Sequence, residues 1–108
     1  MKNYNKLIRD RIPEVMEKEG VKFRVRILND EEYKEELLKK LVEEAKEVLE
    51  TKGDRIELVR EIGDILEVIE SIQKIFELNK DEIEKVKNEK KNKRGGFKEK
   101  LFLESVDA

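Results

Sequence analysis

The chain has 108 residues, of which 48% are charged, and its 25 basic and 27 acidic side chains leave a formal net charge of −2. This length suits a single domain, 1–108, and the balanced charge supplies no field that would attract DNA or an anionic membrane. No apolar run approaches the roughly 18 residues of a membrane span, and the start MKNYNKLIRD lacks the apolar core of a signal peptide. We therefore expect a cytoplasmic protein that binds neither nucleic acid nor membrane.

The first elements expected along the chain are one short helix and one strand. Apolar residues over 6–19 have helical spacing that Pro13 interrupts, which predicts a helical turn and then a helix from Pro13 to Gly20. The segment VKFRVRI, 21–27, alternates apolar and basic residues with the period of a half-buried strand. A lone strand needs a partner, and the other β-like segment is KLFLESV. We expect 21–27 and 100–106 to pair as a minor two-stranded β element, within the subunit or across a dimer.

Two long helical patterns follow. The first begins at Asn29, with Asp30 as its cap, and runs over 31–51. The second is capped by Asp54, and its apolar residues over 54–78 cover well over half of the circumference. Because only TKGD joins the two patterns, we expect antiparallel neighbours. The predicted fold is an all-α antiparallel helical bundle with the minor β element.

The apolar surface of the helix over 54–78 must be buried on several sides. The other helices of the chain are too short to cover all of this surface. We therefore expect the chain to associate with itself as a homodimer or a higher oligomer. After Asn79 a third, highly charged helical pattern runs until Gly95 and Gly96, which end it.

Pairs of carboxylates spaced three residues apart are the most informative feature of the long helices. The pairs are Glu44 and Glu47, then Glu61 and Asp64. Like charges at this spacing destabilise a helix by about 0.2–0.5 kcal/mol per pair. Lys40 can balance the first acid and Arg60 the last, because each lies four residues away. The two middle acids have no cation three or four residues away on their own helix.

These acids should converge when the helices fold back on each other. Both pairs lie a few turns from the TKGD connection, and Glu44 borders the apolar stripe of its helix. Unpaired buried carboxylates cost several kcal/mol unless they are protonated, paired or bound to metal. The chain has no Cys and no His, so the available ligands are oxygens, which hard cations prefer. We predict a metal site; the alternative is a solvated acidic surface, which is common in so charged a chain.

The acids also form a recognisable pattern. EExxE, here Glu43, Glu44 and Glu47, is followed after thirteen residues by ExxD, here Glu61 and Asp64. With YNKLIRDRIP, RILNDEEY and KNKRGGF, this pattern resembles the MazG-like all-α nucleotide pyrophosphohydrolases, in the phosphoribosyl-ATP pyrophosphohydrolase-like or house-cleaning branch. The resemblance implies a homodimer or higher oligomer that binds Mg²⁺, with Mn²⁺ as an alternative. It also implies hydrolysis of a nucleoside triphosphate to the monophosphate and pyrophosphate.

The resemblance makes all five acids catalytic residues. The expected metal ligands are Glu44, Glu47, Glu61 and Asp64. Glu43 lies further from the apolar stripe, so it either supports these ligands from outside or is an ordinary surface glutamate. The pattern does not identify the carboxylate that assists the attacking water.

Basic residues in two parts of the chain are candidates for binding the substrate phosphates. They are Lys87, Lys91, Arg94, Gly95 and Gly96 at the end of the third long helical pattern, and Asn5, Lys6 and Arg9 in the N-terminal motif. The helical set combines cations at helical spacing with glycines that let a backbone approach a ligand, although a solvated helix end has the same composition. In the N-terminal set, Arg9 has a rival role as a structural ion pair with Asp10.

Three other functions are compatible with the sequence. A true phosphoribosyl-ATP pyrophosphohydrolase of histidine biosynthesis would use the same acids on another substrate. A helical interaction module without catalysis would use them to bind a basic partner. Nucleic-acid binding through KVKNEKKNKR is weaker, because no aromatic residue interleaves that run.

Overall fold

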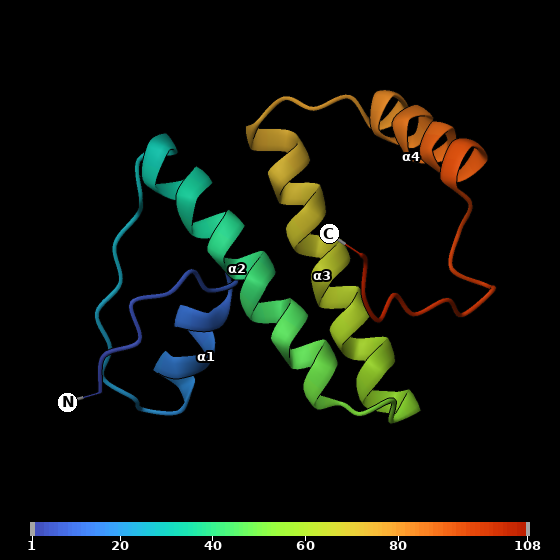
Figure 1. Ribbon diagram of the computed structural model, residues 1–108. Helices are drawn as coiled ribbons and strands as arrows, with labels where there is room; N and C mark the ends of the chain where they lie inside the picture. Colours follow the sequence, from blue (N-terminus) through green and yellow to red (C-terminus); the bar gives the residue numbers. More distant parts are fainter. Residues whose placement is uncertain (1, 108) are drawn as a thin grey trace. The chain divides into compact units, whose positions relative to one another are not determined.

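The computed structural model describes residues 2–107. Within them the chain forms α1 (Ile12–Lys18), α2 (Asp30–Glu50), α3 (Arg55–Ile75) and α4 (Lys80–Arg94), as Figure 1 shows. The chain divides into two compact units, Met1–Glu77 and Leu78–Ala108. The all-α class that we predicted is confirmed, whereas the assignment of 1–108 to a single domain stays a prediction. No described helix is both long enough and apolar enough to cross a membrane.

The long helices begin at side chains that cap their first turns. Oδ1 of Asn29 accepts a hydrogen bond from the backbone N of Glu32 at 2.9 Å, and Oε1 of Glu32 accepts one from the backbone N of Asn29 at 3.5 Å. This reciprocal capping box makes Asn29 the cap of α2, so our choice of Asp30 was wrong by one residue. Asp54 caps α3 as predicted, because its Oδ1 accepts from the backbone N of Glu57 at 3.1 Å.

A tight connection makes α2 and α3 antiparallel neighbours (Figure 1). The hydroxyl of Thr51 donates to the carbonyl of Val48 at 2.7 Å and accepts from the backbone N of Gly53 at 3.2 Å. Lys52 and Gly53 both have positive φ, 53° and 86°, which reverses the chain within a few residues. The buried Thr51 therefore fixes the turn that sets the two helices side by side.

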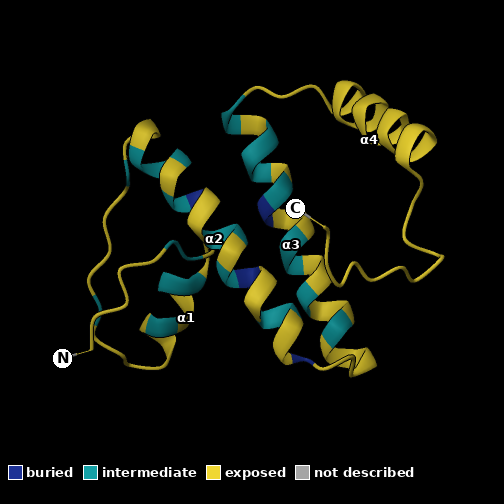
Figure 2. Cartoon of the chain, viewed as in Figure 1, coloured by how far each residue is buried: buried dark blue, intermediate teal, exposed yellow. Residues whose placement is uncertain are grey.

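Little of the apolar surface of the first unit is buried within one chain. Leu37 on α2 and Val68 on α3 are the buried apolar residues among those described (Figure 2). Apolar side chains stay exposed on both helices: Leu38, Val42 and Leu49 on α2, and Ile56, Val59, Ile62 and Leu66 on α3. The expectation that a second copy covers such surface therefore stays a prediction.

The predicted β element does not form in this chain. Residues 2–107 contain no strand, including the segments 21–27 and 100–106. A strand needs a neighbour to receive its backbone hydrogen bonds, and neither segment has such a neighbour among the described residues. Alternation of apolar and basic residues alone could not decide whether such a neighbour exists. Pairing between two chains stays a prediction.

Three helix ends also differ from the prediction. α3 stops at Ile75 rather than 78, and Glu77 has a φ of 53°, which a helix cannot contain. Asn79 does not end α3 but caps α4, because its Oδ1 accepts from the backbone N of Asp81 and of Glu82. α1 starts one residue before Pro13 and ends at Lys18, ahead of Gly20, whose φ is 71°. Local backbone geometry at these positions overrode the apolar pattern.

Candidate metal centre

The four acids predicted as metal ligands converge between α2 and α3. One carboxylate oxygen from each of Glu44, Glu47, Glu61 and Asp64 lies within 4.8 Å of the others. The first two residues come from the end of α2 and the others from the start of α3, so the turn at Thr51 brings the pairs together. The structure thus places these acids at one point, and their role as ligands stays a prediction.

We call the carboxylates of Glu44, Glu47, Glu61 and Asp64 the acidic cluster. Two oxygens of the acidic cluster are buried without a polar partner. Glu44 is only 7% exposed, and its Oε2 has no hydrogen-bond partner among the described residues. The same holds for Oε2 of Glu61. A buried unpaired polar atom costs about 1–3 kcal/mol and a charged one more, so these oxygens are poised to accept a cation or a proton.

The electrostatics of the cluster follow from this burial. Burial raises the pKa of Glu44, and the neighbouring charge of Glu47 raises it further, more than the ammonium group of Lys40 lowers it. Burial also raises the pKa of Glu61, and interaction with Glu47 adds to the effect. A divalent ion would counteract both shifts, because its positive charge favours the ionised carboxylates and offsets their mutual repulsion.

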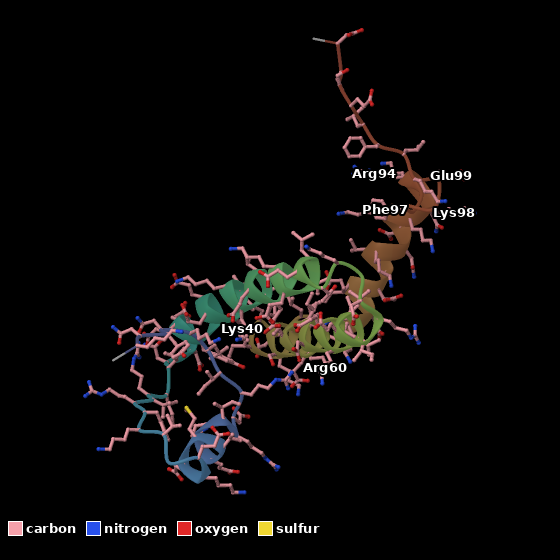
Figure 3. All side chains as sticks on the ribbon, turned by 90° about the horizontal axis from the view of Figure 1, so that it is seen from below. Lys40, Arg60, Arg94, Phe97, Lys98 and Glu99 are labelled. Carbon is pink, nitrogen blue, oxygen red and sulfur yellow. The ribbon has the colours of Figure 1, made fainter. Side chains whose placement is uncertain are left out.

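Cations surround the cluster but leave it incompletely neutralised. Nη2 of Arg9 lies 2.7 Å from Oδ1 of Asp64, and Nζ of Lys40 lies 3.8 Å from Oε1 of Glu44. Arg9 thus pairs with a cluster acid, and not with Asp10 as the rival interpretation held. Figure 3 shows Lys40 on α2 and Arg60, which we had expected to balance Asp64, on α3.

Glu43 lies outside the cluster. Its two carboxylate oxygens each lie 3.3 Å from a lysine, Oε1 from Lys6 and Oε2 from Lys40. Partial burial raises the pKa of Glu43, but the two ammonium groups outweigh this effect and hold the pKa below its usual value. Glu43 is therefore not one of the four converging acids, and whether it supports them stays a prediction. It holds Lys6 and Lys40 beside the cluster.

The predicted phosphate-binding residues are divided between the two units. Lys6 and Arg9 contact acids of the first unit, while Asn5 precedes them with a φ of 46°. The helical set, Lys87, Lys91, Arg94, Gly95 and Gly96, belongs to the second unit, at the end of α4. The phosphate-binding role of both sets stays a prediction.

The α4 end has two features that the sequence did not show. Nζ of Lys87 forms an ion pair with Glu84 at 2.9 Å. Gly95 has a φ of 81°, and its backbone N donates to the carbonyl of Lys91 at 2.8 Å, so glycine is needed there to stop the helix. A Cβ atom on Gly96 would meet Cε of Lys91 at an ordinary 3.8 Å. The backbone requirement for glycine therefore lies at Gly95, not Gly96.

A hollow beside the cluster was missed by the sequence analysis. It is open to solvent and lined by Glu47, Glu50, Thr51, Glu57, Arg60 and Glu61. The spacing of 57, 60, 61 and 64 on one helix face was a usable signal, but we interpreted Arg60 only as the counter-ion of Asp64.

Comparison with known proteins identifies no relative: no family model, no curated protein and no solved structure matches this chain. The class of protein that the fold and site define is therefore an all-α chain with a four-carboxylate cluster.

Proposed function

We propose that this protein is a Mg²⁺-dependent nucleoside triphosphate pyrophosphohydrolase that releases the nucleoside monophosphate and pyrophosphate, with aberrant nucleotides as its substrates. The observation that carries the proposal is the convergence of four carboxylates, two of which, Glu44 and Glu61, each have a buried oxygen without a hydrogen-bond partner. Mg²⁺ binds oxygens at about 2.1 Å, so ligands on opposite sides of the ion are about 4.2 Å apart. The 4.8 Å spread of the cluster is close to this requirement.

The residues that would hold the ion are Glu44, Glu47, Glu61 and Asp64, with Mg²⁺ as the expected cofactor and Mn²⁺ as an alternative. The bound ion supplies neutralisation of the phosphate charge and acidification of a water. Glu47 and Glu61 belong both to the cluster and to the lining of the hollow. They therefore lie where a carboxylate can accept the proton of the attacking water.

Basic residues complete the proposed site. Lys6 and Arg9 are held beside the acids by ion pairs, so they are close enough to receive phosphate oxygens when the acids take up metal. Phosphate binding by the cations of α4 is proposed separately, for the second unit by itself. The proposed protein acts in the cytoplasm as a homodimer or higher oligomer, in which exposed apolar surface of α2 and α3 is covered by a second copy.

The test is pyrophosphate release from a panel of ordinary and damaged nucleoside triphosphates, with phosphoribosyl-ATP included, in Mg²⁺ and in EDTA. We expect release in Mg²⁺ only, and a preference for phosphoribosyl-ATP would assign the protein to histidine biosynthesis instead of house-cleaning. No release from any substrate would refute the hydrolase proposal.

Substitutions test the assignment of the ligands. Glu47→Gln and Glu61→Gln should abolish activity while leaving the metal-free melting temperature unchanged or higher, because each removes charge repulsion. The matched control is Glu70→Gln, an exposed position on the same helix as Glu61. Near-normal turnover in both cluster variants would show that the carboxylates do not hold a catalytic ion.

A further inference from the structure

The hollow next to the acidic cluster contains an arginine that no contact explains. Arg60 is the one basic residue of the lining, and the other charged residues there are four glutamates. On α3 it lies three residues after Glu57 and four before Asp64, and acids at either spacing commonly pair with an arginine. Among residues 2–107, however, the ion pairs do not include Arg60.

The reason that Arg60 is unpaired lies in the tertiary structure. Oδ1 of Asp64 already accepts a hydrogen bond from Nη2 of Arg9 at 2.7 Å, so one of its two carboxylate oxygens is occupied by another guanidinium. Arg60 is itself exposed, and Figure 3 labels it on α3. Its planar guanidinium therefore keeps five N–H donors available to a ligand in the hollow.

We propose that Arg60 binds the phosphate chain of the substrate in this hollow, an assignment that rests on the proposed nucleoside triphosphate hydrolysis. Two lining residues, Glu47 and Glu61, also belong to the acidic cluster, so a phosphate beside Arg60 is next to the candidate metal ligands. A guanidinium binds phosphate oxygens in a bidentate manner, which orients the chain as well as attracting it. The cluster acids would hold an ion that neutralises phosphate charge, and Arg60 would hold phosphate oxygens directly.

The charge of the lining makes this binding conditional. With four glutamates and one arginine, the hollow repels an anion while the cluster is without metal. A divalent ion at the cluster would reduce the formal charge of this lining from −3, the sum of four glutamates and one arginine, to −1, and so weaken the repulsion. Arg60 should therefore contribute to phosphate affinity only when the ion is bound. An arginine that merely balances the acids would instead contribute to the stability of the metal-free protein.

The kinetic test compares Arg60→Gln and Arg60→Lys with wild type in Mg²⁺. Loss of a charged hydrogen-bond pair should lower kcat/KM at least about tenfold in Arg60→Gln, mainly through KM. Arg60→Lys should recover part of the loss, because it keeps the charge but not the bidentate geometry. The control is Arg55→Gln, which removes the same charge from the same helix outside the hollow.

A binding test separates this inference from the proposed function. Inorganic tripolyphosphate is titrated calorimetrically into wild type, Arg60→Gln and Arg55→Gln, with Mg²⁺ and with EDTA. We expect binding by wild type in Mg²⁺ only, weakened at least about tenfold in Arg60→Gln and unchanged in Arg55→Gln. Binding that depends on Arg60 in a protein that hydrolyses no nucleotide would refute the hydrolase but support the phosphate site. An active wild type whose Arg60→Gln and Arg60→Lys variants keep KM and tripolyphosphate affinity would overturn the inference alone.

Discussion

Nη2 of Arg9 lies 2.7 Å from Oδ1 of Asp64, joining residues that are 55 positions apart in the sequence. The arginine precedes α1, whereas the aspartate is one of the four acids between α2 and α3. Both side chains remain partly exposed, 61% and 38%, so the pair contributes only modestly to stability. Its importance is that a cation of the chain itself contacts a proposed metal ligand.

Arg9 should therefore compete with the divalent ion for Asp64. Since exposed ion pairs are worth about 0.2–1 kcal/mol, Arg9→Gln should tighten Mg²⁺ binding in the absence of nucleotide by up to about fivefold. Titration calorimetry measures this affinity. Arg11→Gln is the charge-matched control, because Arg11 lies on the same segment and forms no ion pair with the described residues. Weaker Mg²⁺ binding by Arg9→Gln than by Arg11→Gln would contradict the competition.

The raised pKa of Glu44 predicts how stability depends on pH without metal. Because its folded-state pKa lies above the ordinary value of 4.5, the folded protein binds this proton more readily than the unfolded chain does. The free energy of unfolding should thus fall as pH rises from 4.5 through the raised pKa. Urea unfolding in EDTA should show this fall in wild type, relative to Glu44→Gln, which lacks the titrating group. If the free energies of unfolding of the two proteins differed by a constant amount across this pH range, the effect would be ruled out.

Glu43 should behave in the opposite way. Its pKa is lowered on balance by Lys40 and Lys6, so its stabilising effect is complete above 4.5 and is lost as pH falls through the depressed value. The same unfolding series with Glu43→Gln provides the comparison. Above 4.5 wild type should be more stable than Glu43→Gln, whereas it should be less stable than Glu44→Gln; both differences should shrink in acid, where each carboxylate is protonated.

Self-association is expected through exposed apolar surface and not through the buried positions of α3. Leu66 is 56% exposed, so Leu66→Glu should shift the protein toward monomer with little effect on the fold. Val68 is only 8% exposed within one chain, and a charge there would destabilise the chain itself. Light scattering gives the mass, with Glu67→Gln as a control at the neighbouring exposed position. A stable wild-type monomer at micromolar concentration would refute the association.

The end of α4 provides a test of phosphate binding by the second unit. Arg94→Ala should cost about 1.5–3 kcal/mol of transition-state binding, about tenfold or more in kcat/KM. Gly95→Ala should be worse tolerated than Gly96→Ala, because only Gly95 has positive φ. Steady-state kinetics measures the loss of kcat/KM in Arg94→Ala, and circular dichroism measures the loss of helix in the glycine variants. Full efficiency of alanine variants at both Lys91 and Arg94 would show that these cations form only a solvated helix end.

The sequence by itself determined the helical class, the start of α3 and the positions of the acid pairs. These features depend on neighbours within a few residues: apolar spacing defines the helices, and Asp54 bonds to a backbone N only three residues away. The short TKGD connection also made antiparallel packing of α2 and α3 predictable.

Only the tertiary structure decided which cation each acid contacts. Arg60 was nearer in sequence to Asp64, yet Arg9 pairs with it, and Lys6 reaches Glu43 from 37 positions away. An acidic side chain can pair with any cation that lies close to it in space. Folding, and not distance along the sequence, determines which cations these are. The same reason explains the absent strand at 21–27 in the described chain, because its periodicity fits a strand but no neighbouring strand accepts its backbone hydrogen bonds.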